Sequence, residues 1–248
     1  MIYHVFDPTG NITVLAEGNR DISAADALMK KVPDCEQVGF LTDGGLTLTM
    51  AGGEFCGNAS MCAAALYGSR TGLREVKLNV SGAKEKVRVT VVPDTDGFCC
   101  TVQMPPVEKT QRTVLDFNEE KYDVFAVYMQ GICHLVMRPG TEKSVAEAAA
   151  RQWCALLESD AVGLMFFDEE NKKLTPLVYV RKADTLFWES SCASGTSAVG
   201  EYLAKISNRD ISEDILLPAG TLHVEATPDG TVLLTGTVKI KGSGILPE

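Results

Sequence analysis

With 248 residues, of which 45% are hydrophobic and 23% are charged, the chain has the composition of a globular protein with one large core or two smaller ones. Its formal net charge of −10 argues against nucleic acids and anionic membrane surfaces as partners, because both are themselves negatively charged.

The first part of the chain reads as strands interrupted by two helices. Met1–Phe6 and Ile12–Ala16 are predicted strands on either side of an Asp-Pro-Thr-Gly-Asn turn. Ser23 is the predicted N-cap of a helix that runs to about Val32. A second helix is expected to begin near Cys56, and further strands are predicted over residues 37–41, 46–50, 76–80, 86–92 and 99–104.

The second part follows an irregular linker, which two adjacent prolines predict from Pro105 to about Glu120. Ser144, with Glu147 three residues later, is the predicted cap of a helix over residues 145–157. Strands are predicted over residues 122–128, 131–137, 162–167, 174–181, 222–227, 232–234 and 238–241. The last of these is expected to pair back into the first part, and the predominance of strands predicts the α+β class.

The N-terminal residues lack the basic and apolar regions of a signal peptide, and no window approaches the roughly 18 apolar residues of a membrane span. We therefore expect a cytoplasmic protein whose 8 cysteines are free thiols. No C-x-x-C pair occurs and the 3 histidines are well separated, so no metal site is expected. Cys99, Cys100 and Cys154 are interpreted as structural.

The stretch from Ala51 to Tyr67 places a cysteine at a helix start. Two glycines, an acid and Cys56 precede a Gly-Asn signal, and an Ala-rich run of helix formers follows. The unpaired N–H groups and positive dipole of a helix N-terminus lower the pKa of a thiol there and attract anionic ligands. A single cysteine in this position is weak evidence, because most free cysteines are small buried hydrophobic residues.

Residues 187–204 repeat this arrangement around Cys192. The two cysteines lie about 136 residues apart, and Pro93 and Pro228, each after a strand pattern, lie about 135 apart, a shared offset that indicates two copies of one unit. We therefore predict two pseudo-symmetric halves. They are residues 1–113, completed by the C-terminal strand 237–248, and residues 114–236, with the two cysteines facing each other across a cleft.

Two facing thiols suit inversion at an α-carbon. One sulfur, as thiolate, takes the α-proton from one face, and the other, as thiol, returns a proton to the opposite face, without a cofactor. Converging backbone N–H groups would stabilise the charge that develops on the substrate carboxylate. The small residues after each cysteine are assigned to carboxylate binding, although turn chemistry alone also explains them: Gly57, Asn58, Ala193 and Ser194.

Four further polar residues keep two interpretations each. Asn11 is either a turn residue or a polar group that points into the cleft, and His134 is either a structural strand residue or a cleft residue. Glu54 and Glu189, each shortly before a cysteine, either bind the substrate amine or cap the following helix.

The motifs Cys-Gly-Asn-Ala at 56–59 and Cys-Ala-Ser-Gly-Thr at 192–196, with Gly10-Asn11, resemble signatures of the diaminopimelate epimerase fold family. Within that family the chain is most similar to the histidine racemases that feed opine-metallophore synthesis. The resemblance implies two halves, each a curved, mostly antiparallel sheet around a central helix, with an acid/base cysteine pair at their interface. It also implies a cleft that closes over the substrate, no cofactor, and, as in many members, a homodimer.

Departures from the pattern bear on the substrate. Diaminopimelate enzymes carry two asparagines and a Glu-Arg pair where this chain has Met50, Ile132 and Val180-Arg181, which argues against diaminopimelate. Ala193 replaces the usual glycine after the second cysteine, but its backbone N–H is retained.

The resulting hypothesis is a cofactor-independent amino-acid racemase, with histidine as the favoured substrate and Cys56 and Cys192 as the acid/base pair. One alternative is a diaminopimelate epimerase or another amino-acid isomerase of the same fold. Two alternatives from other classes are a catalytically silent amino-acid binding protein and a thiol redox protein.

Overall fold

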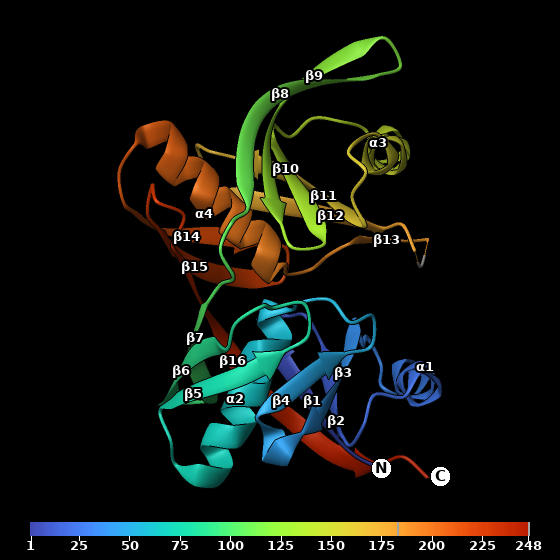
Figure 1. The fold of residues 1–248 in the computed structure, drawn as a ribbon, viewed down its shortest axis with the longest axis vertical. Coiled ribbons are helices and arrows are strands. Elements are labelled where there is room, and N and C mark those ends of the chain that lie inside the picture. Colours follow the sequence, from blue (N-terminus) through green and yellow to red (C-terminus); the bar gives the residue numbers. More distant parts are fainter. Residues whose placement is uncertain (183, 248) are drawn as a thin grey trace. The chain divides into compact units, whose positions relative to one another are not determined.

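The structure, a computed structural model, describes residues 1–182 and 184–247, and the chain divides into two compact units. The first comprises Met1–Pro105 and Leu233–Glu248, and the second comprises Pro106–Val232. In both units strands predominate over helices (Figure 1), so the predicted α+β class is confirmed. The unit bounds differ by several residues from the predicted halves, and pseudo-symmetry between the halves stays a prediction.

The first unit is a sheet that closes on itself. Its strand order is β1-β2-β3-β4-β5-β6-β7-β16, and β16 also pairs with β1, so no strand of this ring is left with an open edge. The pairs β2–β3 and β4–β5 are parallel and the others antiparallel. The strands are β1 (Ile2–Pro8), β2 (Thr13–Glu17), β3 (Gln37–Thr42), β4 (Thr47–Met50), β5 (Glu75–Val80), β6 (Val87–Asp94), β7 (Gly97–Gln103) and β16 (Val232–Ile245).

The long final strand β16 confirms that the end of the chain pairs back into the first part. Ile2 lies opposite Ile245 and Pro8 opposite Val238, with a register shift between Val5 and Phe6. The two strands predicted over residues 232–234 and 238–241 are therefore one continuous strand.

Helix α2 (Gly57–Thr71) contacts β1, β2, β5, β6 and β7 of this closed sheet. It is buried nearly all round, including three consecutive alanines at 63–65, as expected for a helix enclosed by apolar strands. Helix α1 (Ile22–Lys31) instead buries one face, made by Ala24, Ala25 and Leu28, and packs against β3. A short 3₁₀ helix, η1 (Asp43–Gly45), joins β3 to β4.

The second unit has the strand order β8-β9-β10-β11-β12-β14-β15, and β13 pairs with β12. The pairs β10–β11 and β12–β14 are parallel, and the remaining pairs are antiparallel. The strands are β8 (Lys109–Phe117), β9 (Glu120–Met129), β10 (Ile132–Met137), β11 (Ala161–Asp168), β12 (Lys173–Val180), β13 (Thr185–Trp188), β14 (Ile211–Leu217) and β15 (Gly220–Ala226).

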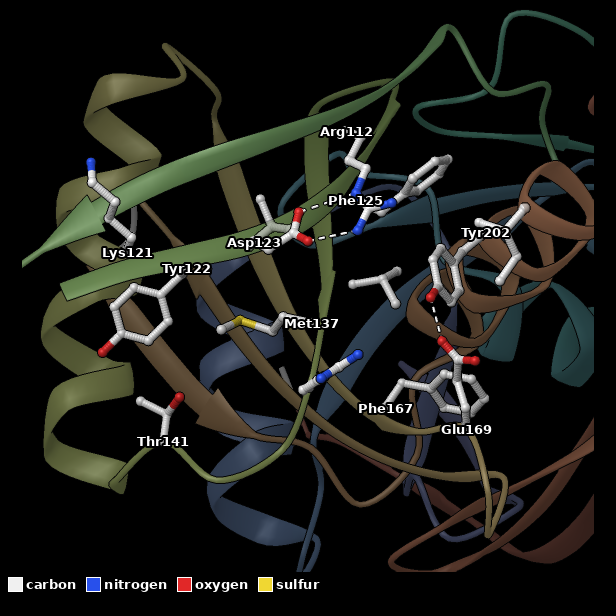
Figure 2. Close-up of a pocket in the computed structure, with 14 residues that line it drawn as sticks. Arg112, Lys121, Tyr122, Asp123, Phe125, Met137, Thr141, Phe167, Glu169 and Tyr202 are labelled. Atoms are coloured by element: carbon white, nitrogen blue, oxygen red, sulfur yellow. Dashed lines mark hydrogen bonds and ion pairs between the residues drawn. The ribbon is translucent and has the colours of Figure 1, made fainter.

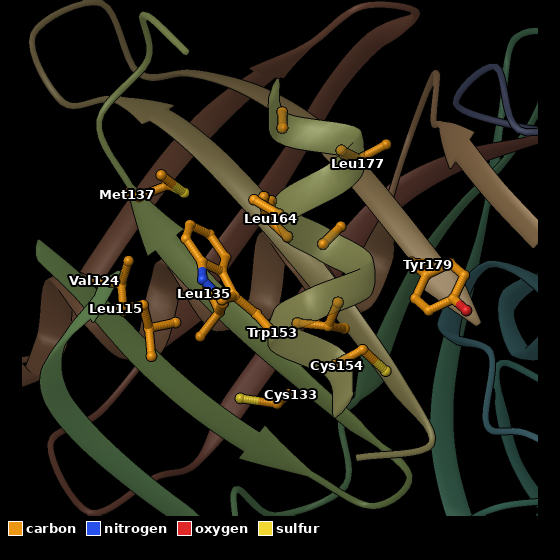
Figure 3. Close-up of a cluster of buried hydrophobic side chains, with 14 of the residues drawn as sticks. Leu115, Val124, Cys133, Leu135, Met137, Trp153, Cys154, Leu164, Leu177 and Tyr179 are labelled. Atoms are coloured by element: carbon orange, nitrogen blue, oxygen red, sulfur yellow. The ribbon is translucent and has the colours of Figure 1, made fainter. Parts of the chain in front are cut away.

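Two helices pack on this second sheet. Helix α4 (Ala193–Ser207) contacts β9, β10, β11, β14 and β15, whereas α3 (Lys143–Leu156) contacts β11 and β12. Figure 3 shows Trp153 of α3 among Leu135 and Leu164 of the strands, in a cluster that also holds Cys133 and Cys154. The indole of Trp153 is fully buried and donates its N–H to the Asp116 carbonyl at 3.1 Å, so its polar edge is satisfied.

Several local predictions are wrong. Asp21, not Ser23, caps α1, because its carboxylate accepts from the backbone N–H groups of Ser23 and Ala24. Helix α3 begins after Glu142, so Ser144 lies inside the helix rather than at its cap. Glu147 instead accepts the indole N–H of Trp188 at 2.8 Å.

The predicted linker is also corrected. Residues 109–117 form β8, which pairs with β9 along its whole length, so only a short segment after Pro105 is irregular. Strands β13 and β14 were not predicted. Within the described residues, no helix has the length and apolar character that crossing a membrane requires.

Candidate active site

Cys56 is the N-cap of α2, which confirms the predicted place of this cysteine. Its backbone is extended (φ −136°), and its carbonyl accepts the first helical hydrogen bond from Ser60 N–H at 3.0 Å. Its sulfur accepts the Ala59 N–H at 3.3 Å. The thiol therefore occupies the position where a serine or aspartate oxygen normally caps a helix, within the positive end of the helix dipole.

A network of polar side chains at the starts of β2 and β3 extends from this sulfur. The Cys56 thiol donates to Gln37 Oε1 at 2.9 Å, and Gln37 Nε2 donates to Thr13 Oγ1 at 2.8 Å and to Asn11 Oδ1. Asn11 Nδ2 in turn donates to the carboxylate of Glu36. Asn11 is 5% exposed, and its side chain joins this network rather than only closing a turn.

The loop before Cys56 is held from the neighbouring turn. Ser81 Oγ donates to the Glu54 carbonyl at 2.8 Å and accepts the Met50 N–H at 2.9 Å. Gly82, at φ +73°, lies so close that a Cβ on it would come within 2.2 Å of Phe55 N. A residue with a side chain at position 82 would therefore push this loop, and Cys56 with it.

Cys192 is the N-cap of α4 in the second unit, again as predicted. Its sulfur accepts the Gly195 N–H at 3.3 Å and lies 3.7 Å from Ser194 Oγ. The residue is 5% exposed, and burial raises the pKa of its thiol well above the usual value, with the charge of Glu189 and a hydrogen bond to it acting in the same direction. Cys192 is therefore a thiol, not a thiolate, at neutral pH.

Gly195 is required by this geometry. A Cβ at Gly195 would lie 2.3 Å from Met165 Sδ and 3.1 Å from Cys192 Sγ. The first turn of α4 can approach both sulfurs only because position 195 has no side chain.

The four positions assigned to carboxylate binding lie in the first turns of the two helices. Gly57, Asn58 and Ala193 are buried and Ser194 is partly buried. The first N–H groups of a helix have no acceptor within the helix, so both turns present donors of the kind that binds a carboxylate. Their role in binding stays a prediction.

The two glutamates are not the helix caps, because the cysteines themselves hold those positions. The capping interpretation of Glu54 and Glu189 is therefore wrong. Glu189 N–H donates to the Pro176 carbonyl at 3.0 Å, and its carboxylate interacts with Cys192. Amine binding by either residue stays a prediction.

His134 is fully buried on β10, and neither ring nitrogen has a hydrogen-bond partner among the described residues. Burial lowers the pKa of this imidazole to about 3, so it is neutral at physiological pH. Gly163 lies opposite on β11, where a Cβ would come within 2.3 Å of His134 Nδ1. The absence of a side chain at Gly163 thus leaves space for the imidazole ring, but the described part of the sheet offers no hydrogen-bond partner to its nitrogens.

The structure therefore links Asn11 to Cys56 in the first unit, and Glu189 and Ser194 to Cys192 in the second. The sequence reading missed Gln37, the residue that joins Asn11 to Cys56. The available signal was a glutamine at the start of an otherwise apolar strand.

A separate cavity of about 430 Å³ lies in the second unit (Figure 2) and contains none of the predicted site residues. Arg112 donates to Asp123 at 2.7 Å, and the Tyr202 hydroxyl donates to Glu169; both interactions are marked by dashed lines in Figure 2. Among the residues that the structure describes, no group of three or more His, Cys, Asp or Glu side chains is arranged to hold a metal ion.

Comparisons with known proteins agree along nearly the whole chain. A family model described as the histidine racemase CntK N-terminal domain matches residues 1–246. The histidine racemase of Fusobacterium nucleatum subsp. nucleatum is 32% identical, over 96% of this chain and 93% of that protein. The histidine racemase of Staphylococcus aureus strain Mu50 is 29% identical, over 93% of this chain and 86% of that protein.

Two solved structures share the fold. A predicted epimerase from Pseudomonas aeruginosa has a TM-score of 0.73 and 16% identity, covering 100% of this chain and 99% of that one. A probable proline racemase from Agrobacterium radiobacter K84 has a TM-score of 0.70 and 13% identity, covering 99% of this chain and 92% of that one.

Proposed function

Because the chain belongs to the histidine racemase family, we propose that it interconverts L- and D-histidine by a two-base reaction at Cys56 and Cys192, without a cofactor. The observation that carries this proposal is the shared geometry of the two cysteines. Each is the N-cap of a helix, and each sulfur accepts the N–H of the residue three positions later, at 3.3 Å.

The arrangement of the two thiols follows from a proposed pseudo-symmetry of the two halves. In each unit two parallel strands are joined along the chain through one helix: β2 and β3 through α1, and β10 and β11 through α3. In each unit a second pair of parallel strands lies before and after the cysteine helix along the chain. These strands are β4 and β5 around α2, and β12 and β14 around α4, with β13 between β12 and α4. An approximate two-fold relation between such units would bring the two helix N-termini to a common cleft.

The proposed reaction moves one proton in and one proton out. The thiolate of one cysteine accepts the α-proton, and the C–H electron pair becomes an enediolate delocalised over the substrate carboxylate. The thiol of the other cysteine then donates its proton to the opposite face of the α-carbon, which inverts the centre. After turnover the two sulfurs have exchanged protonation states.

Backbone amides supply the electrostatic stabilisation. The N–H groups after Cys56, at Gly57 and Asn58, and those after Cys192, at Ala193 and Ser194, bind the carboxylate in this proposal. They oppose the negative charge that grows on it in the transition state, typically the largest contribution in such reactions. Small side chains at these positions leave the amides accessible.

Four polar residues complete the proposed site. Asn11 and His134 line the cleft, and Glu54 and Glu189 bind the α-amino group as carboxylates. Cys192 starts the proposed reaction as the protonated thiol, and therefore as the acid, since burial and Glu189 raise the pKa of its thiol. A cytoplasmic location fits this chemistry because reduced thiols persist there. A homodimer is proposed for the same protein.

The first test is α-proton exchange in D₂O, followed by NMR and chiral chromatography, with reduced protein, no added cofactor and a panel of L- and D-amino acids. Deuterium incorporation with inversion of histidine is the expected result. Inversion of another amino acid alone would contradict the substrate and keep the chemistry. Saturable binding without exchange would instead support a silent binding protein.

The second test removes each thiol in turn. Cys56→Ser and Cys192→Ser should each lower racemisation by roughly 10²–10⁴-fold or more, because a serine hydroxyl is too weak an acid to supply the base at neutral pH. Each variant should still release fluoride from a β-fluoro substrate analogue, since elimination needs one base. Racemisation at the wild-type rate in either variant would refute the two-base reaction.

A further inference from the structure

Gln37 lies at the first position of β3, and its carboxamide connects three groups of the first unit. Its Oε1 accepts the Cys56 thiol at 2.9 Å. Its Nε2 donates to Thr13 Oγ1 at 2.8 Å and to Asn11 Oδ1.

The neighbours of Gln37 fix which way its carboxamide faces. The hydroxyl of Thr13 donates to the backbone carbonyl of Asn11 at 3.0 Å and lies 3.4 Å from Asn11 Oδ1. Its single proton is therefore directed to Asn11, and Thr13 Oγ1 accepts from Gln37. Asn11 Nδ2 donates to the Glu36 carboxylate, so Asn11 Oδ1 also faces Gln37 as an acceptor. Both constraints direct the NH₂ group of Gln37 away from Cys56, and they leave the oxygen beside the sulfur.

The resulting hydrogen-bond chain has one direction. Protons point from Cys56 to Gln37, from Gln37 to Asn11, and from Asn11 to Glu36. A carboxylate can end such a chain because it accepts and does not donate. Gln37 therefore cannot rotate to offer an N–H to a Cys56 thiolate without breaking two other hydrogen bonds.

We infer that Gln37 is a positioning residue, which directs the Cys56 S–H and raises the proton affinity of Cys56 against the effect of the helix N-terminus. The Ala59 N–H and the positive end of α2 favour the thiolate, whereas an acceptor oxygen favours the thiol. This proton affinity matters for the reaction. A Cys56 thiolate stabilised only by the helix would be a weak base toward the substrate α-C–H, and Gln37 makes the Cys56 thiolate a stronger base. This inference rests on the proposed function, because it assigns Cys56 the work of a base.

Other ionisable groups of the same unit lie near Cys56. Glu36 ends the chain of amides, Glu54 precedes the cysteine by two residues, and Cys62 on α2 interacts with the Cys56 charge. The thiol of Cys35, before β3, donates to the backbone carbonyl of Gln37 at 3.4 Å. Burial raises the pKa of the thiols of Cys35, to about 11, and of Cys62. None of these groups is changed in the variants below, so differences between variants in the pH midpoint of Cys56 alkylation report on position 37.

The test is the pH profile of Cys56 alkylation by iodoacetamide, followed residue by residue by tandem mass spectrometry from pH 6 to 10. Gln37→Leu removes the acceptor, so the alkylation midpoint should fall by about one pH unit. Gln37→Glu puts a negative charge beside the sulfur, so the midpoint should rise by about one unit or more. Gln111→Leu and Gln111→Glu, on the exposed strand β8, are the matched controls and should leave the midpoint unchanged.

Two readouts separate this inference from a folding defect and from the proposed function. Cys62 and Cys100, both fully buried, should stay unreactive while Cys56 reacts, which reports an intact first unit. With substrate, both Gln37 variants should lose at least ten-fold in kcat with a smaller change in KM. Midpoints that move in the same direction, or not at all, would overturn the inference, as would an unchanged kcat. Wild-type racemisation by Cys56→Ser would refute the proposed function instead, without altering the alkylation result.

Discussion

A single glycine, Gly82, helps to position the loop before Cys56. Gly82 adopts φ +73° and packs against the backbone of residues 54 and 55, and Ser81 beside it donates to the Glu54 carbonyl. Two constraints therefore act at position 82: a left-handed backbone and the absence of space for a Cβ. The loop that carries the thiol is positioned by the neighbouring turn as well as by its own helix.

Gly82→Ala is expected to combine both penalties. Gly72 has a similar φ of +77° but open space around it, so Gly72→Ala should cost about 1–2 kcal/mol for the left-handed backbone alone. Gly82→Ala should cost more, and it should also shift the alkylation rate of Cys56, because the Phe55 backbone must move. Urea unfolding and peptide-resolved alkylation check the two effects. Equal losses in the two variants would show that the close contact carries no energy.

His134 predicts an acid-sensitive contribution to stability. Its pKa is about 3 in the folded protein and about 6.5 in an unfolded chain, so below pH 6.5 the unfolded state binds a proton that the folded state does not. The free energy of unfolding should therefore fall as pH drops from about 6.5 toward 3, by up to about 1.4 kcal/mol per pH unit from this group.

The measurement is urea unfolding at several pH values between 7.5 and 4.5, for wild type and His134→Met. Methionine fills a similar volume and does not titrate, so the variant should show a shallower pH slope, whatever its absolute stability. Carboxylates titrate in both proteins and cancel in the comparison. Parallel slopes for the two proteins would contradict the burial of a neutral imidazole.

At the scale of elements, the helices of the two cysteines could be predicted because their signals are local. Gly57-Asn58 and Ala193-Ser194 follow each cysteine directly; a run of good helix formers comes next in α2, and an apolar-periodic segment comes next in α4. The N-cap residue of α1 was harder to predict from the sequence. Asp21 and Ser23 are both good caps, and the extended backbone at Asp21 (φ −138°) settles which one serves.

Paired substitutions test that assignment. Asp21→Ala should destabilise the protein by about 1 kcal/mol, because two backbone N–H groups at the start of α1 lose their acceptor. Ser23→Ala should change stability by less than about 0.5 kcal/mol, since Ser23 lies in the first turn of α1 and its side chain is not the cap. Urea unfolding compares the two. The opposite order would restore Ser23 as the cap.

Other elements escaped prediction for physical reasons. Strand β8 is mostly exposed and polar, so it lacks the apolar alternation that marks a half-buried strand, and its pairing with β9 defines it. Gln37 escaped because its partners Cys56 and Asn11 lie far from it in the sequence. A pattern of neighbouring residues predicts helices and strands, but it carries no information about which amide oxygen meets which thiol.

At the scale of the whole molecule, the first unit is discontinuous in sequence. Strand β16 completes its sheet by pairing with β7 on one side and β1 on the other. Removing residues 237–248 should therefore leave β1 without β16 and shorten the pairing of β16 with β7 to residues 233–236. The second unit, residues 106–232, keeps all its strands in such a truncation.

Hydrogen–deuterium exchange should show this asymmetry. In the truncated chain, amides of β1 and α2 should lose protection, while amides of α3 around Trp153 should stay protected. A chain that ends at Leu246 is the matched control, because it retains the backbone hydrogen bond from Leu246 N–H to the Met1 carbonyl at 2.8 Å. Unchanged protection of α2 in the longer truncation would show that β16 is dispensable for the first unit.

The late position of β16 also sets an order of events during translation. Residues 106–232 are made as one uninterrupted segment before most of β16, so all strands of the second unit are synthesised while the first unit still lacks its last strand. The first unit must wait for β16, although most of its residues are made earlier. Proteins commonly fold from the N-terminus onward as they are synthesised. Here the helix that bears Cys56 acquires its complete enclosure last, so the unit that holds the N-terminus is the later of the two to complete its fold.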